Sequence, residues 1–191
     1  AGGDAAAKTI SIPIINNAAL SGGSRVFSVA LSDPGGATIG ANAGVQVTIT
    51  DDEKGVAFAS ATHEVTEGTA SIVLSVNRIG PTTQALAVPW STANGSALAG
   101  TQFGTSGSTA QRSGTLSWAA GDAMAKNITI PILSNAISHG DTAFTVAIGT
   151  MPAGFIKGEP NVATVTVHDD DLPPESVVRF ASPKVTIVEF S

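Results

Sequence analysis

Apolar and polar residues alternate along several short segments of this chain, which is the pattern of half-buried β-strands. The clearest case is residues 164–168, within an expected strand at 162–168, where Val165 and Val167 fall on one face. Similar segments, separated by turn residues, are 56–58, 64–66, 71–77, 85–92, 115–118, 126–133 and 143–148. The helical period is absent from the sequence. The pattern therefore predicts an all-β domain of about seven short strands in two sheets.

The same alternation predicts the core. Four aromatic side chains fall on inward positions, and we interpret them as core rather than as a sugar-stacking surface: Phe58, Trp90, Trp118 and Phe144. Pro131 lacks the N–H that a central strand needs, so its strand is expected at a sheet edge or at a bulge. The segment 96–113 is rich in Ser, Gly and Thr and is predicted to be mostly loop.

The chain contains an internal repeat. Residues 3–14 (GDAAAKTISIPI) match residues 121–132 (GDAMAKNITIPI), an offset of 118 residues that Asp51 and Asp169 also keep. Further along, residues 56–60 (VAFAS) return as residues 178–182 (VRFAS). We therefore expect three parts: the C-terminal half of one copy in 1–52, a complete copy in 53–171 and the first strand of a further copy in 172–191.

Residues 1–52 supply only the last three strands of a sandwich, so one apolar face needs a cover. The residues on that face are Ile10, Ile12, Ile14, Phe27, Val29, Leu31, Val45, Val47 and Ile49. Two explanations of how this face is covered remain possible. One is the remaining strands of a longer tandem array, and the other is strand exchange with a neighbouring subunit that accepts residues 172–191 in return.

Composition excludes several function classes. The 191 residues carry a net charge of −6 and only nine Lys and Arg, too few for a nucleic-acid surface. The absence of cysteine excludes disulfides and cysteine-ligated zinc, and the three histidines have no near-neighbour histidine to complete a zinc set. No apolar run approaches the length that spans a bilayer. No nucleophile elbow or aromatic cleft is visible either, so we expect no enzyme activity.

Acidic residues are concentrated in two runs, each directly after a strand. They are Asp51, Asp52 and Glu53, and Asp169, Asp170 and Asp171. Carboxylates this close repel one another unless a cation lies between them. Calcium prefers six to eight oxygen ligands, so both runs are candidate calcium sites.

Several motifs along the complete copy together resemble the Calx-beta domain. They are Glu67-Gly68, SVNR at 75–78, WSTANGSA at 90–97, GTLSW at 114–118, Gly121-Asp122 and HDDD at 168–171. The resemblance extends over nearly the entire chain. It implies an immunoglobulin-like two-sheet antiparallel sandwich, as found in sodium/calcium exchangers, integrin β4 and many bacterial surface proteins. It also implies calcium bound between the loops at one end of the sandwich.

The resemblance implies a set of calcium ligands that this sequence only partly retains. The matching positions are Glu67, Asp169, Asp170 and Asp171. Gln102, Ser134 and Asn135 replace acidic residues, and the choice between His139 and Asp141 stays open. The run at Asp51 lacks an equivalent of Glu67 within the chain. Two interpretations remain: one calcium ion bound weakly, with a Kd of about 0.1–1 mM, or a solvated acidic cap without an ion.

We therefore expect a non-catalytic structural and adhesion module of a large secreted or cell-surface protein of bacterial type. Calcium at the junction between copies would stiffen the array. The expected partners are neighbouring repeats or subunits through strand pairing, with a surface polysaccharide or a host surface as further candidates. The alternatives are a self-assembling filament or sheath subunit completed by strand exchange, and a carbohydrate-binding module.

Overall fold

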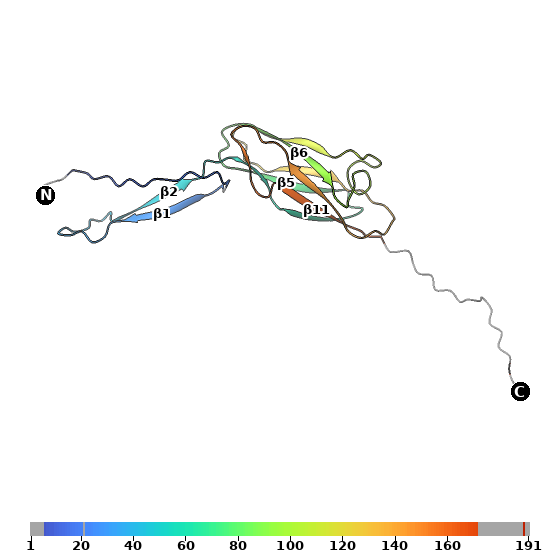
Figure 1. The fold of residues 1–191 in the computed structure, drawn as a ribbon, viewed down its shortest axis with the longest axis horizontal. Coiled ribbons are helices and arrows are strands. Elements are labelled where there is room, and N and C mark those ends of the chain that lie inside the picture. Colours follow the sequence, from blue (N-terminus) through green and yellow to red (C-terminus); the bar gives the residue numbers. More distant parts are fainter. Residues whose placement is uncertain (1–5, 21, 172–188, 190–191) are drawn as a thin grey trace.

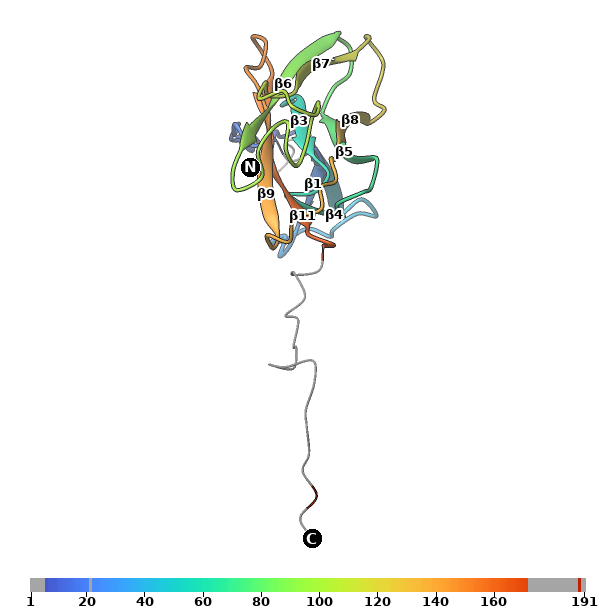
Figure 2. The same ribbon diagram turned by 90° about the vertical axis from the view of Figure 1, so that its right-hand side faces the viewer.

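The computed structural model describes residues 6–20, 22–171 and 189, and the regular elements among them are all β-strands. A two-stranded hairpin near the N-terminus is followed by a sandwich of two larger sheets (Figures 1 and 2). The all-β prediction is therefore confirmed. Within the described part of the chain there is no helix that would cross a membrane.

The sandwich has a four-stranded and a five-stranded sheet. The first has the order β10 (Ile156–Lys157), β3 (Gly55–Phe58), β5 (Ser71–Ile79) and β8 (Lys126–Pro131). The second has the order β4 (Thr62–Thr66), β11 (Val162–His168), β9 (Thr142–Ile148), β6 (Leu86–Asn94) and β7 (Ser113–Trp118). Pro131 ends β8, which is an edge strand, as the sequence predicts.

Side chains from the two sheets meet in one core. The alternation of the sequence is reproduced in the burial pattern of β5, where every second side chain is buried. Phe58, Trp118 and Phe144 are buried, which confirms their predicted inward position. Trp90 is only partly buried and packs over Gly114, where a Cβ atom would lie 2.9 Å from the indole Nε1. Glycine at position 114 therefore leaves the space that this indole fills.

The two sheets are joined by the divided first strand, whose halves β3 and β4 belong to different sheets. Most strand pairs are antiparallel, as expected, but β4 pairs with β11 in parallel, and β10 pairs with β3 in parallel. These two parallel pairings were not predicted from the sequence. Because β4 and β11 run in the same direction, the chain enters β4 at one end of the sandwich and leaves β11 at the other.

The long segment between β6 and β7 contributes to the core as well as to the surface. Phe103 is fully buried, and its ring stacks on Phe144 with centroids 4.0 Å apart. A short bridge pairs Phe103 with Ile132. The interpretation of this segment as mostly loop is confirmed in its backbone, but its anchoring in the core was missed. The high Ser, Gly and Thr content of this segment gives no indication that Phe103 is buried in the core.

The N-terminal hairpin repeats the geometry of the last two long strands of the sandwich. In β1 (Ser24–Ala30) and β2 (Gly44–Thr50), Phe27 lies opposite Val47. In β9 and β11, Phe144 lies opposite Val165, which is the residue 118 positions after Val47. The repeat seen in the sequence therefore also holds for strand pairing and register.

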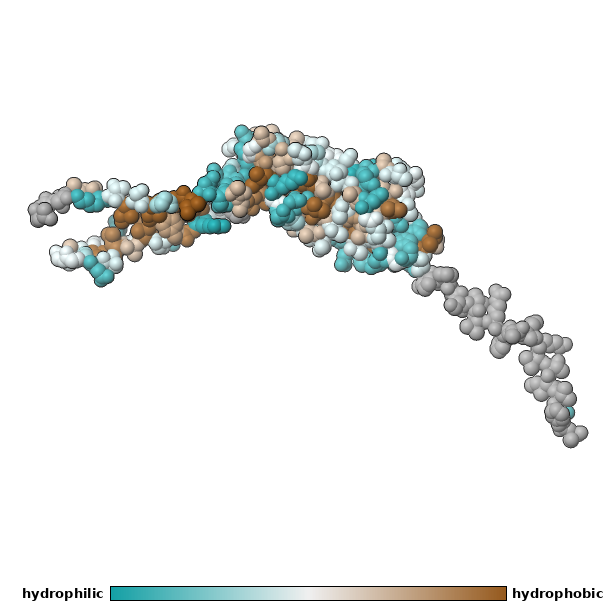
Figure 3. All heavy atoms as spheres, viewed as in Figure 1, coloured by the Kyte–Doolittle hydropathy of each residue, from teal (hydrophilic) through white to brown (hydrophobic). Residues whose placement is uncertain are grey.

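Three strands are expected in residues 1–52, and the described residues of this segment form two of them. The three isoleucines of residues 10–14 are outside any strand and are 63%, 43% and 53% exposed. Their equivalents in residues 128–132 are 1%, 0% and 6% exposed. Residues 126–131 form a strand by pairing with β5, and the described part of the first copy contains no equivalent of β5. Figure 3 shows the resulting apolar surface beside the hairpin.

We predict that Phe103→Ala lowers the free energy of unfolding of the sandwich by about 3–5 kcal/mol, because it removes a fully buried ring and leaves a cavity. Urea denaturation followed by tryptophan fluorescence measures this change. Met124→Ala, at a side chain that is 72% exposed, is the control and should change stability by less than about 0.5 kcal/mol. A similarly small effect of Phe103→Ala would contradict the role of this loop in the core.

Candidate metal centre

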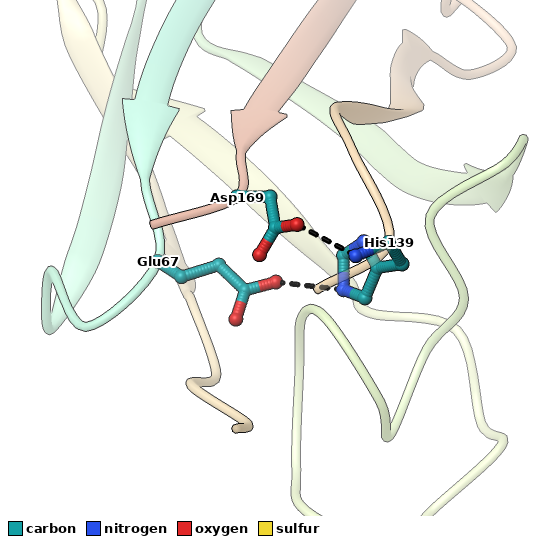
Figure 4. Close-up of side chains that lie close together, drawn as sticks. All are labelled: Glu67, His139 and Asp169. Carbon is teal, nitrogen blue, oxygen red and sulfur yellow. Dashed lines mark hydrogen bonds and ion pairs between the residues drawn. The ribbon is translucent and has the colours of Figure 1, made fainter. Parts of the chain in front are cut away.

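The parallel pairing of β4 and β11 brings the acidic residues together at one end of the sandwich. Thr66 lies opposite His168 in the register, so the next residues, Glu67 and Asp169, leave their strands side by side. The Glu67 N–H donates to the His168 carbonyl at 3.0 Å. Figure 4 shows the two carboxylates facing His139, which comes from the loop between β8 and β9. Three segments distant in sequence therefore meet at this site.

Glu67 is the buried member of the site, with 3% of its surface exposed. One carboxylate oxygen, Oε2, accepts hydrogen bonds from Asn135, from Nδ2 at 2.7 Å and from the backbone N–H at 3.2 Å. The other oxygen, Oε1, is buried and accepts no hydrogen bond within the described residues, although His139 Nε2 lies 3.2 Å away. A buried carboxylate oxygen needs a positive partner. Here that partner is either a cation or the protonated imidazole of His139, whose pKa is raised by its hydrogen bond with the Gly140 carbonyl.

Asp169 is held by the loop before β9. Its Oδ2 accepts backbone hydrogen bonds from Gly140 at 2.8 Å and His139 at 2.6 Å, and these bonds lower the pKa of Asp169. Gly140 has a φ of 75°, a conformation that favours glycine. A glycine directly after His139 is the sequence signal for this loop conformation. This signal was not recognised from the sequence.

Two groups of three side chains at this end could each hold a metal ion. In each group the three ligand atoms lie within 4.8 Å of one another, and both groups contain Glu67. The first group, Glu67, Asp170 and Asp171, offers only carboxylate oxygens. The second, Glu67, His139 and Asp169, adds an imidazole nitrogen. Asp171 Oδ2 is a second buried carboxylate oxygen without a hydrogen bond in the described structure.

The first group fits calcium. Its donors are all oxygens, as calcium requires, and two of its oxygens, on Glu67 and Asp171, are buried without a hydrogen-bond donor. Asp171 is also oriented by a bond from its own N–H to Asp169 Oδ1 at 3.2 Å. If calcium is bound here, Glu67, Asp170 and Asp171 would hold it.

Asp141, the other candidate, belongs to neither of these groups. Its Oδ2 lies 2.7 Å from His168 Nδ1, and its Oδ1 accepts the Asp169 N–H at 3.3 Å. The hydrogen bond with His168 lowers the pKa of Asp141, and the same bond raises the pKa of His168. Between His139 and Asp141, the structure thus brings His139 toward Glu67. Asp141 instead fixes the end of β11.

The three residues that replace acidic ligands form hydrogen bonds with neighbouring parts of the protein. Gln102 is buried, and its Oε1 accepts the Leu98 N–H at 2.9 Å inside the long loop. Asn135 donates to Glu67 instead of offering its own oxygen, because its Oδ1 already accepts the Ile137 N–H at 2.9 Å. Ser134 lies beside it, with its hydroxyl 3.5 Å from the Asn135 carbonyl.

The first acidic run reproduces only part of the site. Asp51 Oδ2 accepts the Gly22 N–H at 2.9 Å, just as Asp169 accepts from Gly140. A hydrogen bond with Asp51 raises the pKa of Glu53. Neither these two residues nor Asp52 joins a metal-binding group among the described residues.

The pairing of His168 with Asp141 predicts a pH dependence of stability. Because the pKa of His168 is raised above its ordinary 6.5, its contribution is complete below pH 6.5 and is lost as the pH rises through the raised value. The pKa of Asp141 is lowered from 3.8, so its share is present above pH 3.8 and is lost below it.

We therefore expect the unfolding midpoint of the wild-type protein to exceed that of His168→Gln by most between pH 3.8 and pH 6.5, and the difference to shrink as the pH rises above 6.5. Thermal unfolding in EDTA at several pH values measures this difference. A constant difference across this range would contradict the charged pair.

Comparisons with known proteins agree with this architecture. The family model of the Calx-beta domain matches residues 50–171. The crystal structure of the apo-form Calx CBD1 domain aligns at 25% identity with a TM-score of 0.57, over 63% of this chain and 100% of that chain. The calcium binding domain CBD12 of CALX1.1 aligns at 26% identity with a TM-score of 0.55, over 61% of this chain and 44% of that chain.

The Calx CBD2 domain is more distant and supports the fold alone. It aligns at 19% identity with a TM-score of 0.52, over 60% of this chain and 86% of that chain. A comparison with curated proteins gives no significant match. The family model covers more than half of the chain, including both β4 and β11 and the acidic residues that follow them. The chain therefore belongs to the Calx-beta domain family.

Proposed function

We propose that the complete copy is a non-catalytic, calcium-binding structural module of a large secreted or cell-surface repeat protein. Calcium binds at the end where the chain leaves β11, so it acts at the junction with the following segment. Its role is to neutralise this end and to stiffen the junction. Adhesion is the corresponding biological role, with the repeats acting as spacers.

The observation that carries this proposal is the pair of buried carboxylate oxygens without donors, Glu67 Oε1 and Asp171 Oδ2. Both residues belong to the group in which one carboxylate oxygen from each of Glu67, Asp170 and Asp171 lies within 4.8 Å of the others. Two carboxylate charges about 4 Å apart repel by roughly 1 kcal/mol in water and by about 4 kcal/mol near a protein surface. A divalent cation between them replaces this repulsion by attraction. The similarity to the calcium binding domain CBD12 of CALX1.1 supports the choice of calcium.

We expect calcium to raise the thermal unfolding midpoint. With a Kd of about 0.1–1 mM, about 10 mM calcium stabilises the folded state by about 1.4–2.7 kcal/mol. For a domain of this size the midpoint rises by about 5–10 °C. Thermal unfolding of the whole chain in EDTA and in calcium, followed by circular dichroism, measures the shift.

The control variants separate the metal site from general charge effects. Asp170→Asn and Asp171→Asn should each abolish most of the shift. Asp122→Asn should keep it, because Asp122 pairs with Lys126 at 2.7 Å beyond the other end of β8. If calcium leaves the midpoint of the wild-type protein unchanged, the cluster is a solvated cap and the proposed calcium role is wrong.

A second candidate function, self-assembly by strand exchange, is favoured by the open hairpin. β2 is equivalent to β11, which in the complete copy lies between β9 and β4. Only β1 pairs with β2 among the described residues, so the edge of β2 that corresponds to the β4 side is open. Glu189 is equivalent to Glu67, so residues 184–188, which lie outside the described residues, stand at the sequence positions of β4. The same segment of a second copy fits this edge.

Strand exchange predicts oligomers whose size depends on residues 172–191. Light scattering after size-exclusion chromatography should show the full chain shifting to larger species as its concentration rises, whereas a chain of residues 1–171 remains a monomer. A full chain of 19.0 kDa that stays monomeric at high concentration would exclude this candidate. That result would leave a tandem array as the explanation of the half-copy.

A further inference from the structure

We propose that Glu67, His139 and Asp169 form a binding site for a divalent transition-metal ion of the zinc class. This site is separate in its chemistry from the all-oxygen group and shares only Glu67 with it. The inference does not depend on calcium binding. It revises the sequence-based exclusion of zinc, which considered only cysteine and neighbouring histidines as ligands.

The orientation of the His139 ring supports a metal ligand. Its Nδ1 lies 2.8 Å from the Gly140 carbonyl oxygen, which accepts only, so Nδ1 carries a proton. In the neutral ring the other nitrogen, Nε2, then has a lone pair, and it lies 3.2 Å from Glu67 Oε1 (Figure 4). Two electron-pair donors thus face each other, and Glu67 Oε1 receives no hydrogen bond within the described residues. A proton or a metal ion can occupy the position between them.

The other bonds of the site match the surroundings of known metal ligands. A histidine ligand usually donates its second ring N–H to a carbonyl or carboxylate, and ligand carboxylates are themselves hydrogen-bonded. His139 donates to Gly140, Glu67 accepts from Asn135, and Asp169 accepts from the two backbone N–H groups of the loop. Asn135 Nδ2 also lies 3.2 Å from His139 Nε2, and this contact opens when a metal ion binds.

The donor set selects the class of metal. One imidazole nitrogen and two carboxylates suit zinc and its neighbours, which bind nitrogen and oxygen at about 2.0–2.2 Å. Calcium and magnesium are hard cations that prefer oxygen, so a nitrogen ligand favours the zinc class over them. Three protein ligands leave one tetrahedral position for water.

His168 supplies a matched control within the same chain. It is also a histidine beside carboxylates, with Asp141 at 2.7 Å and Glu64 at 3.6 Å. These three residues do not form a metal-binding group among the described residues, because their ligand atoms do not converge. A general attraction of zinc to histidine and acid would therefore affect both histidines equally.

The test is titration of the whole chain with zinc chloride, by isothermal calorimetry and by the shift of the unfolding midpoint. We expect one zinc ion to bind, and His139→Gln to weaken its binding by about tenfold or more. His168→Gln and Asp170→Asn should bind zinc within about twofold of the wild-type protein. Cobalt should give a visible absorption spectrum of a nitrogen-coordinated ion in the wild-type protein and in His168→Gln, but not in His139→Gln.

Two outcomes would overturn the inference. If the wild-type protein does not bind zinc, the position between His139 and Glu67 holds only a proton. If His139→Gln binds zinc as the wild-type protein does, the ion lies on the carboxylates. Circular dichroism of each variant in EDTA verifies folding. Calcium titration of the same variants is independent: Asp170→Asn should lose the calcium response and keep the zinc response, so either proposal can fail alone.

Discussion

The parallel pairing of β4 with β11 is the constraint on which the rest of the structure depends. Through this pairing β4, the second half of the first strand, becomes the edge strand of the five-stranded sheet, while β3, the first half, stays in the other sheet. Because the two strands run the same way, the residues after both strands emerge at one end. An antiparallel pair in the same place would put Glu67 and Asp169 at opposite ends of the sandwich. The site is therefore a result of strand direction as much as of residue type.

The burial of Glu67 gives this end of the sandwich its chemical character. A lone carboxylate is expensive to bury unless donors or a cation surround it. Asn135 satisfies one of its oxygens, and the other lies 3.2 Å from His139 Nε2. Asp170 and Asp171 also each place a carboxylate oxygen within 4.8 Å of a Glu67 oxygen. Glu67 is therefore shared by two groups of metal ligands, one with oxygen atoms only and one that includes the His139 nitrogen. An ion bound to either group changes the electrostatic potential at the other.

Much of the fold could be predicted from the sequence, because alternation and turn residues are local signals. The strand around Val165 and the edge position of Pro131 are examples. Non-local effects could not be predicted. The choice of His139 over Asp141 near Glu67 follows from a loop that turns at Gly140. The exposure of residues 10–14 follows from a missing partner strand, and no local pattern reports a missing partner.

The direction of β4 and β11 also has a mechanical consequence. The chain enters β4 at one end of the sandwich and leaves β11 at the other, so tension along the chain pulls these two neighbouring strands past each other. Their ladder then carries the load in shear, and its hydrogen bonds have to break together rather than one after another. Resistance to stretching is a rate property, governed by the barrier to unfolding. An ion that joins Glu67 to the residues after β11 would cross-link the ends of the same two strands and raise that barrier further.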